Sequence, residues 1–446
     1  MQVGKGLTVG VPRETFPGEK RVALTPGAVP VLLEAGMGVL IEFGAGESAG
    51  FPDRAYADQG ATVVRWRNEV FGADVMLRVR ALGPNLDAAR QELDRLCPDQ
   101  VVVGLCDPLS HLEAVQALAE RKVTLFAMDL IPRITRAQSM DALSSQATVA
   151  GYKAVILAAR ALPKMFPMLT TAAGTIPPAR VFVVGAGVAG LQAIATAKRL
   201  GAVVEAYDIR PDVKEQVHSV GAKFVELELA AGQAQDGGGY AQAMDEDFYR
   251  RQRELMARVV AGSDVVITTA SVPGRPAPQL VTAEMVAAMA PGSVIVDLAA
   301  ERGGNCELTR PDEVVTADGV KIYGPTNLPA TAAYQASLLY AKNITTFLLH
   351  LARDRAVSVD LEDEITCGTL LVRGGEIVHP VLRKALGLQV PEDEGPPDSA
   401  PAPQRSPQPV GAEPGDPAAA GSPGGDGQGR RRRRWRRGPR AAEKVR

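Results

Sequence analysis

Three glycines follow an apolar run in the segment V-F-V-V-G-A-G-V-A-G at 181–190, and their spacing is G-x-G-x-x-G. Gly185 would allow a sharp turn, Gly187 would let the backbone approach a pyrophosphate, and Gly190 would let the next helix pack closely on the strand. The N-terminus of that helix would face the phosphates with unpaired N–H groups and the positive end of its dipole. The segment therefore predicts a dinucleotide-binding turn.

An acidic residue, Asp208, ends the apolar run that follows this helix, about 20 residues after the glycines. Its carboxylate could accept hydrogen bonds from the adenosine ribose diol, and its charge would repel a 2′-phosphate. NAD is therefore favoured over NADP, although Arg210 is near enough to keep NADP as an alternative. Further residues that we expect at the nucleotide, beside these motifs or in other loops, are Val188, Ile209, Gly239, Thr269 and Ala270.

Expected strands and helices alternate along most of the chain, in two sets. The first set has strands at 7–11, 39–42, 62–65, 75–79, 101–105 and 123–127, with helices that include 26–35 and 112–121. This alternation is typical of a doubly wound sheet, yet none of its turns carries a phosphate-binding glycine cluster. A second set around the glycine turn has expected strands at 224–227, 265–269 and 294–297 and helices at 248–260 and 282–289. Long helices are expected at 140–162 and 332–351.

The predicted fold class is α/β, with two Rossmann-like doubly wound domains joined by long helices and a disordered C-terminal tail. Residues 1–145 together with 330–390 would form the first domain, and residues 146–329 the NAD(H)-binding domain. Residues 391–446 are rich in proline, glycine and alanine before a run of arginines. Such a segment buries too little apolar surface to order itself, so we expect it to be disordered.

Composition argues against several other classes of protein. The 446 residues include four scattered cysteines without C-x-x-C spacing, which argues against a disulfide scaffold or a zinc site and fits a reducing compartment. We expect no metal site. A signal-peptide pattern and an apolar stretch of membrane-spanning length are both missing, so we expect a soluble protein. The part before the tail is mildly acidic, which argues against nucleic acid as its main ligand.

A second cluster of polar residues lies at 128–146, where the expected domains meet, and reads M-D-L-I-P-R-I-T-R-A-Q-S-M-D-A-L-S-S-Q. Ligands of two-domain α/β proteins sit in interdomain clefts, so this segment is a candidate ligand site. The alternative is an N-terminal cap, in which Ser139 or Asp141 holds the first helical turn.

Several long motifs resemble the NAD(H)-binding component of proton-translocating nicotinamide nucleotide transhydrogenases. They are segment 128–146, P-G-E-K-R-V-A-L-T-P at 17–26, T-A-A-G-T-I-P-P-A-R at 171–180, A-G-L-Q-A-I-A-T-A-K-R-L-G-A-V at 189–203, P-G-S-V-I-V-D-L-A at 291–299 and G-G-N-C at 303–306. The similarity covers residues 5–385, and Arg133, Gln138 and Asp141 match the family's R-x-x-x-x-Q-x-x-D loop. In some family members, membrane-spanning segments follow this component, and this chain has none. It therefore resembles the NAD(H)-binding component of the three-subunit arrangement, in which that component is a free-standing subunit.

This resemblance implies that NAD(H) binds here and exchanges hydride with NADP(H) on a partner subunit, while a membrane subunit couples the exchange to proton translocation. It implies that Gln138 bridges to the partner's NADP(H), and that Arg133, Asp141 and Ser144 hold the nicotinamide end of NAD(H). Tyr240, on the glycine-rich loop D-G-G-G-Y-A, resembles a mobile-loop tyrosine that closes over the nucleotide. A homodimer on the cytoplasmic face of the inner membrane is expected.

Hydride transfer between two nicotinamides needs no general acid or base, because no oxygen or nitrogen changes its protonation. It needs two rings held face to face at a near-attack distance, with water excluded. The histidines agree with this chemistry, because all four lie outside the junction loop and the glycine turn: His111, His218, His350 and His379. We expect structural or surface roles for them.

Alanine dehydrogenases share the fold and much of the N-terminal pattern, so they are the main alternative. Their substrate-binding lysine and histidine have no counterparts in M-L-R-V-R-A-L at 76–82 or V-V-V-G-L-C-D-P-L at 101–109, whereas both families keep Arg21. A non-enzymatic alternative is an NAD-binding scaffold that uses its basic tail to find a partner. For the tail itself, the alternatives are a solvated extension, an anchor on an anionic membrane surface through its arginines and Trp435, and RNA binding.

Overall fold

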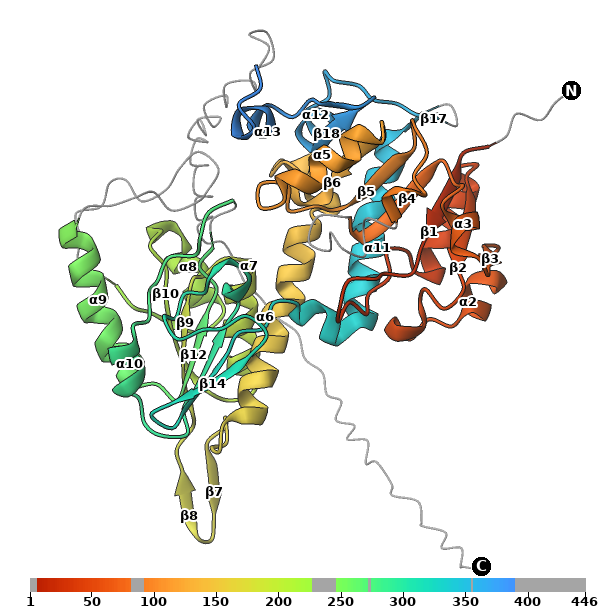
Figure 1. Cartoon of the computed structure of the whole chain (residues 1–446). Coiled ribbons are helices and arrows are strands. Elements are labelled where there is room, and N and C mark those ends of the chain that lie inside the picture. Colours follow the sequence, from red (N-terminus) through yellow and green to blue (C-terminus); the bar gives the residue numbers. More distant parts are fainter. Residues whose placement is uncertain (1–5, 82–91, 227–245, 272–273, 354–355, 390–446) are drawn as a thin grey trace, which may run out of the picture. The chain divides into compact units, whose positions relative to one another are not determined.

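A computed structural model of the chain describes residues 6–81, 92–226, 246–271, 274–353 and 356–389. These residues form two large, mainly parallel sheets with helices around them (Figure 1). The α/β class with two Rossmann-like sheets is therefore confirmed. The predicted tail at 391–446 and the loop that carries Gly239 and Tyr240 lie outside the described residues.

The first sheet has eight strands in the order β19-β18-β6-β5-β4-β1-β2-β3. Its parallel strands are β1 (Thr8–Val11), β2 (Gly38–Glu42), β3 (Thr62–Val64), β4 (Val75–Arg80), β5 (Val101–Leu105) and β6 (Thr124–Ala127). Two strands from near the C-terminus, β18 (Leu370–Arg373) and β19 (Glu376–Ile377), extend the sheet in antiparallel fashion beside β6. Its helices are α1 (Val29–Glu34), α2 (Asp53–Asp58), α3 (Arg67–Val70), α5 (Leu112–Glu120), α12 (Glu364–Thr369) and α13 (Pro380–Ala385).

The second sheet has seven strands in the order β11-β10-β9-β12-β13-β15-β14. They are β9 (Arg180–Val184), β10 (Val203–Tyr207), β11 (Lys223–Phe224), β12 (Val265–Thr268), β13 (Val294–Asp297), β14 (Val314–Ala317) and β15 (Val320–Tyr323). Every residue of β12 and β13 is buried, which explains why both strands are apolar up to their last residue, Thr268 and Asp297. The strand order reverses between β9 and β12, and ligands of open α/β sheets bind at such a switch point.

The helices of the second sheet are α7 (Val188–Arg199), α8 (Lys214–Ser219), α9 (Glu246–Ala261) and α10 (Ala283–Ala287). A separate hairpin, β7 (Leu169–Thr171) and β8 (Gly174–Ile176), extends away from this sheet (Figure 1). We did not expect this hairpin from the sequence, because its threonines, alanines and glycine lack the alternation of a half-buried strand.

Two long helices, α6 (Ala142–Ala161) and α11 (Ala333–Leu351), occupy the regions where long helices were expected. The first turn of α6 packs into the core of the first sheet through Ala142, and its last turns pack into the core of the second through Val155 and Ala158. Helix α11 contributes Tyr340 and Phe347 to the first core. Among the described helices, none has both the length and the apolar character needed to cross a membrane.

Candidate functional site

The glycine turn connects β9 to α7 at the switch point of the second sheet. Gly185 has a φ of +94°, and a Cβ there would lie 2.5 Å from the Thr269 side-chain oxygen. A Cβ on Gly190 would lie 1.8 Å from the Gly185 carbonyl oxygen. A Cβ on Gly187, in contrast, would meet no atom within 4 Å. The protein's own packing thus requires Gly185 and Gly190, whereas the open space at Gly187 fits the close approach of a ligand.

Helix α7 begins at this turn, with Gly187 as its N-cap residue. No side chain caps the helix there, so its first N–H groups are not covered by a capping oxygen. The positive end of a twelve-residue helix therefore faces the space beside Gly187, and these properties suit a pyrophosphate. Val188, the first residue of α7, has an exposed side chain.

Asp208 lies directly after β10 and contacts the glycine turn. One of its carboxylate oxygens, Oδ2, accepts a hydrogen bond from the Ala186 N–H at 2.7 Å. Arg210 donates to both oxygens, from its backbone N–H and Nε to Oδ1 and from its guanidinium to Oδ2 at 3.1 Å. Ile209 between them is half-buried. The acid thus lies where the sequence predicts it, and a ribose diol that binds it must displace the Arg210 guanidinium.

Thr269 and Ala270 follow β12, on the other side of the switch point. The Thr269 hydroxyl donates to the Gly185 carbonyl at 3.0 Å, so it braces the glycine turn. The side-chain amide of Asn305 accepts from the Ala270 N–H at 3.0 Å and donates to the Ala270 carbonyl at 2.8 Å. Asn305 is fully buried, and its own N–H donates to Asp297 at the end of β13.

Sequence reasoning missed Asn305 as a residue that shapes this site. The motif G-G-N-C at 303–306 contains it, but from the sequence this motif indicates only the family resemblance. A buried asparagine after two glycines could have been interpreted as a side chain that binds backbone groups of a neighbouring loop.

The junction residues lie at the start of α6. Gln138 belongs to a short 3-10 helix, η4 (Thr135–Met140), and its side chain is exposed, as is that of Arg133 just before it. Asp141 is the N-cap residue of α6: its Oδ1 accepts from the Ser144 N–H at 2.9 Å, and the Ser144 hydroxyl donates to its Oδ2. The capping interpretation is therefore confirmed for Asp141.

Helices α6 and α7 bring the junction residues toward the glycine turn. A Cβ on Gly151 of α6 would lie 2.1 Å from the Ala189 carbonyl oxygen, so the two backbones touch in the first turn of α7. Ser144 is seven residues before Gly151, which corresponds to about 10 Å along the helix axis. The start of α6, with Asp141 and Ser144, therefore lies about two helical turns from the point where α6 touches the first turn of α7.

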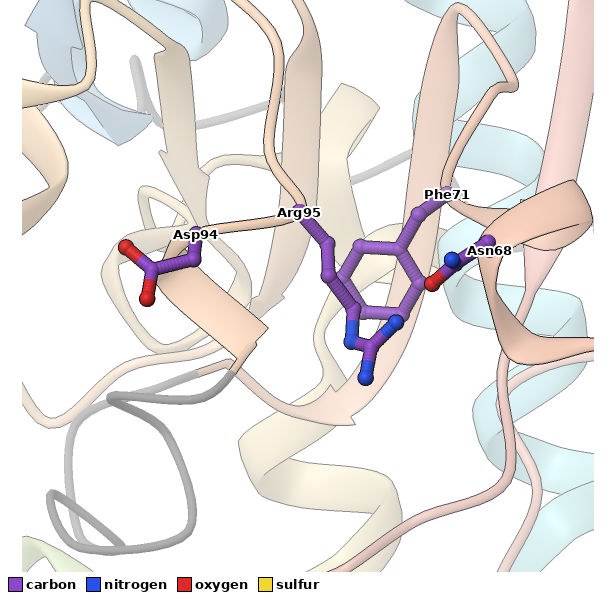
Figure 2. Close-up of a pocket in the computed structure, with 4 residues that line it drawn as sticks. All are labelled: Asn68, Phe71, Asp94 and Arg95. Carbon is purple, nitrogen blue, oxygen red and sulfur yellow. The ribbon is translucent and has the colours of Figure 1, made fainter.

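A shallow hollow near α3, beside the first sheet, is lined by Asn68, Phe71, Asp94 and Arg95 (Figure 2). It contains none of the side chains predicted to bind the nucleotide. Among the described residues, the candidate nucleotide site is therefore the glycine turn with the start of α6, and this hollow is not part of it.

Comparison with known proteins identifies the family. Models described as "Alanine dehydrogenase/PNT, N-terminal domain" and "Alanine dehydrogenase/PNT, C-terminal domain" match residues 10–150 and 154–380. An NAD(P) transhydrogenase alpha-subunit chain of Rhodospirillum rubrum is 47% identical over 380 residues, which are 84% of this chain and 99% of that protein. The chain belongs to the NAD(P) transhydrogenase alpha-subunit family. This membership confirms the resemblance and the predicted nicotinamide nucleotide cofactor.

A solved structure agrees with this assignment to the transhydrogenase alpha-subunit family. The crystal structure of transhydrogenase from Sinorhizobium meliloti has a TM-score of 0.75 and 47% sequence identity, and the match covers 83% of this chain and all of that one. The alanine dehydrogenase of Bacillus subtilis is 28% identical over 394 residues, 86% of this chain and 96% of that protein. Alanine dehydrogenases are thus more distant relatives of this transhydrogenase-family chain.

Two buried arginines near the first sheet form ion pairs with carboxylates of the chain. Arg78 donates to Glu92 at 2.6 Å and lies 3.6 Å from Glu14. Burial raises the pKa of the Glu14 carboxyl. Arg21 pairs with Glu19 at 2.7 Å; burial alone would raise the pKa of Glu19, but its bonds with Arg21 outweigh burial and lower it to about 2. In this transhydrogenase-family chain, both arginines are therefore paired with the protein's own carboxylates.

Proposed function

We propose that this chain binds NAD(H) at the glycine turn and exchanges hydride with NADP(H) held on a partner subunit, while a membrane subunit couples the exchange to proton translocation. One observation carries the proposal: Gly151 of α6 touches the first turn of α7 beside the glycine turn, and the same helix begins at the capping Asp141, just after the exposed Gln138. An exposed amide just beyond the nicotinamide end of a bound dinucleotide is available to a second nucleotide that arrives from outside.

The proposed roles of the junction residues follow from their present bonds. Asp141 and Ser144 bond to each other, and their side-chain oxygens keep lone pairs that can accept further hydrogen bonds from a carboxamide or a ribose hydroxyl. Arg133 and Gln138 have exposed side chains, so both are accessible to a nucleotide that binds beside the start of α6. Their task is to hold two rings at a near-attack distance and to exclude water, because the step moves no separate proton.

We also propose a division into two domains, with 1–145 and 330–390 in one domain and 146–329 in the other. The pairing of β18 with β6 supports this division, since residues from both proposed segments of the first domain share one sheet.

A homodimer is part of the proposal. The hairpin β7–β8 stands apart from both large sheets with almost all of its residues exposed, and an isolated two-stranded hairpin is marginal in water without a partner surface. The assembly would lie on the cytoplasmic face of the inner membrane.

Replacing Asp208 with alanine is expected to weaken NADH binding by roughly 10- to 100-fold, because a charged hydrogen bond is worth about 1.5–3 kcal/mol. The preference for NADH over NADPH should fall with it, since the carboxylate no longer repels a 2′-phosphate. Calorimetric titration of both nucleotides measures the two effects. Asp212, an exposed acid four residues later, provides the matched control Asp212→Ala, which should change neither affinity. Unchanged NADH binding by Asp208→Ala would rule out the assigned ribose contact.

A further inference from the structure

Gln138 is presented by η4, and this short helix is secured mainly by elements from the far end of the chain. Ala137 and Met140 bury its inner face against the first core. A six-residue 3-10 helix has poor hydrogen-bond geometry of its own, so its position depends on such outside contacts. Two further contacts, one on each side of Gln138, come from α11 and α12.

The first contact is an ion pair between Arg136 and Asp363. The Arg136 guanidinium donates to Asp363 Oδ1 at 2.7 Å. The other oxygen, Oδ2, accepts from the Thr366 N–H and hydroxyl, both at 2.8 Å, and lies 2.8 Å from His350 Nε2. Asp363 is therefore fixed as the N-cap residue of α12 and as the partner of His350 at the end of α11. Burial would raise the pKa of its carboxyl, but these hydrogen bonds outweigh burial and hold it far below its usual value.

The second contact joins Asn343 of α11 to the backbone of η4. The Asn343 side-chain amide donates to the Ser139 carbonyl at 2.8 Å. Its Oδ1 is buried, and no partner for it occurs among the described atoms. A buried amide oxygen without a partner lowers stability, so a residue chosen for packing alone would not be an asparagine. The bond to Ser139 is what this side chain provides.

We propose that Asp363 and Asn343 are positioning residues for hydride transfer, because they hold η4 on both sides of Gln138 and so fix the direction in which its amide points. The inference rests on the proposed function, in which Gln138 reaches the partner's nucleotide. Neither residue touches the glycine turn or the start of α6 in any described hydrogen bond. Their loss should therefore leave NADH binding intact and slow the reaction with the partner.

The test is Asp363→Asn in the full chain, assayed with an NADP(H)-binding transhydrogenase component. Asparagine caps a helix as well as aspartate does, so α12 is kept while the charge that attracts Arg136 is removed. We expect kcat for hydride transfer to fall about tenfold or more, since small misplacements of reacting groups have effects of that size. NADH affinity should stay at its wild-type value. The urea midpoint of unfolding should fall modestly, because the bonds of Asp363 with Thr366 and His350 favour the charged carboxylate. Arg353→Gln, which breaks the nearby exposed pair with Asp360, is the matched control and should change none of the three.

Four further variants separate the outcomes. Asn343→Leu removes the bond to Ser139 together with the unpartnered oxygen, and should lower kcat without lowering NADH affinity. Arg136→Gln should lower kcat as much as Asp363→Asn does. A variant that carries both substitutions should be no slower than either alone, because both act through one ion pair. If Gln138→Leu slows the reaction and neither Asp363→Asn nor Asn343→Leu does, the positioning role is wrong. If Gln138→Leu itself has no effect, the proposed function fails instead.

Discussion

Replacing Gln138 with leucine is expected to slow hydride transfer between NADH on this chain and NADP(H) on its partner by about a hundredfold, because loss of the bridging amide misplaces the two rings. NADH affinity should remain within about twofold of the wild-type value, since the amide is exposed and faces away from the chain's own core. Single-turnover kinetics with the partner component and calorimetry of NADH binding measure the two quantities separately.

Gln335 provides a matched control for this prediction. It is an exposed glutamine on α11, so Gln335→Leu makes the same chemical change on another surface, and it should leave hydride transfer at the wild-type rate. If Gln138→Leu weakens NADH binding as strongly as it slows the reaction, Gln138 acts on this chain's own nucleotide and the bridging role is wrong.

Alanine at Gly187 and alanine at Gly190 are expected to impair different properties, NADH binding in the first case and stability in the second. Gly187→Ala should weaken NADH binding at least about tenfold, because the new methyl group fills space that a pyrophosphate needs. It should cost less than about 1 kcal/mol of stability, since a Cβ there meets no atom within 4 Å and only the N-cap preference changes. Gly190→Ala should destabilise the protein by about 2 kcal/mol or more, because its Cβ would collide with the Gly185 carbonyl.

Urea unfolding and NADH titration of both variants check this contrast. Gly27 is a suitable control, because a Cβ at that position also meets no atom within 4 Å and the residue lies far along the chain from the glycine turn. Gly27→Ala should change neither stability nor binding appreciably. Normal NADH affinity in Gly187→Ala would mean that the pyrophosphate lies elsewhere.

The parts of the site that the sequence could predict are those set by local patterns. The glycine turn and Asp208 lie within one strand–helix–strand unit, so their spacing along the chain determines their positions in space. The cap at Asp141 is local for the same reason, because it satisfies an N–H three residues later. The parallel strands could be predicted from their apolar runs, although their order in the sheets could not.

The features that the sequence did not reveal depend on contacts between distant residues. Asn305 binds Ala270 across 35 positions, and Arg136 pairs with Asp363 across 227. No periodicity or spacing encodes such pairs, because they exist only once the sheets have formed. The hydrogen bonds of Arg210 with Asp208 could not be predicted for another reason. Both residues are evident in the sequence, but spacing does not show in which direction a side chain points after a strand.

The central claim is that hydride passes directly between NAD(H) on this chain and NADP(H) on another polypeptide. The measurement is transfer of deuterium from NADH deuterated at the reacting carbon, in ordinary water, followed by mass spectrometry of the NADPH formed. The account predicts no NADPH from the chain alone, and, after an NADP(H)-binding transhydrogenase component is added, NADPH that carries the deuterium. Hydrogen from water in the product, or rapid oxidation of NADH by pyruvate and ammonia without any partner, would contradict it.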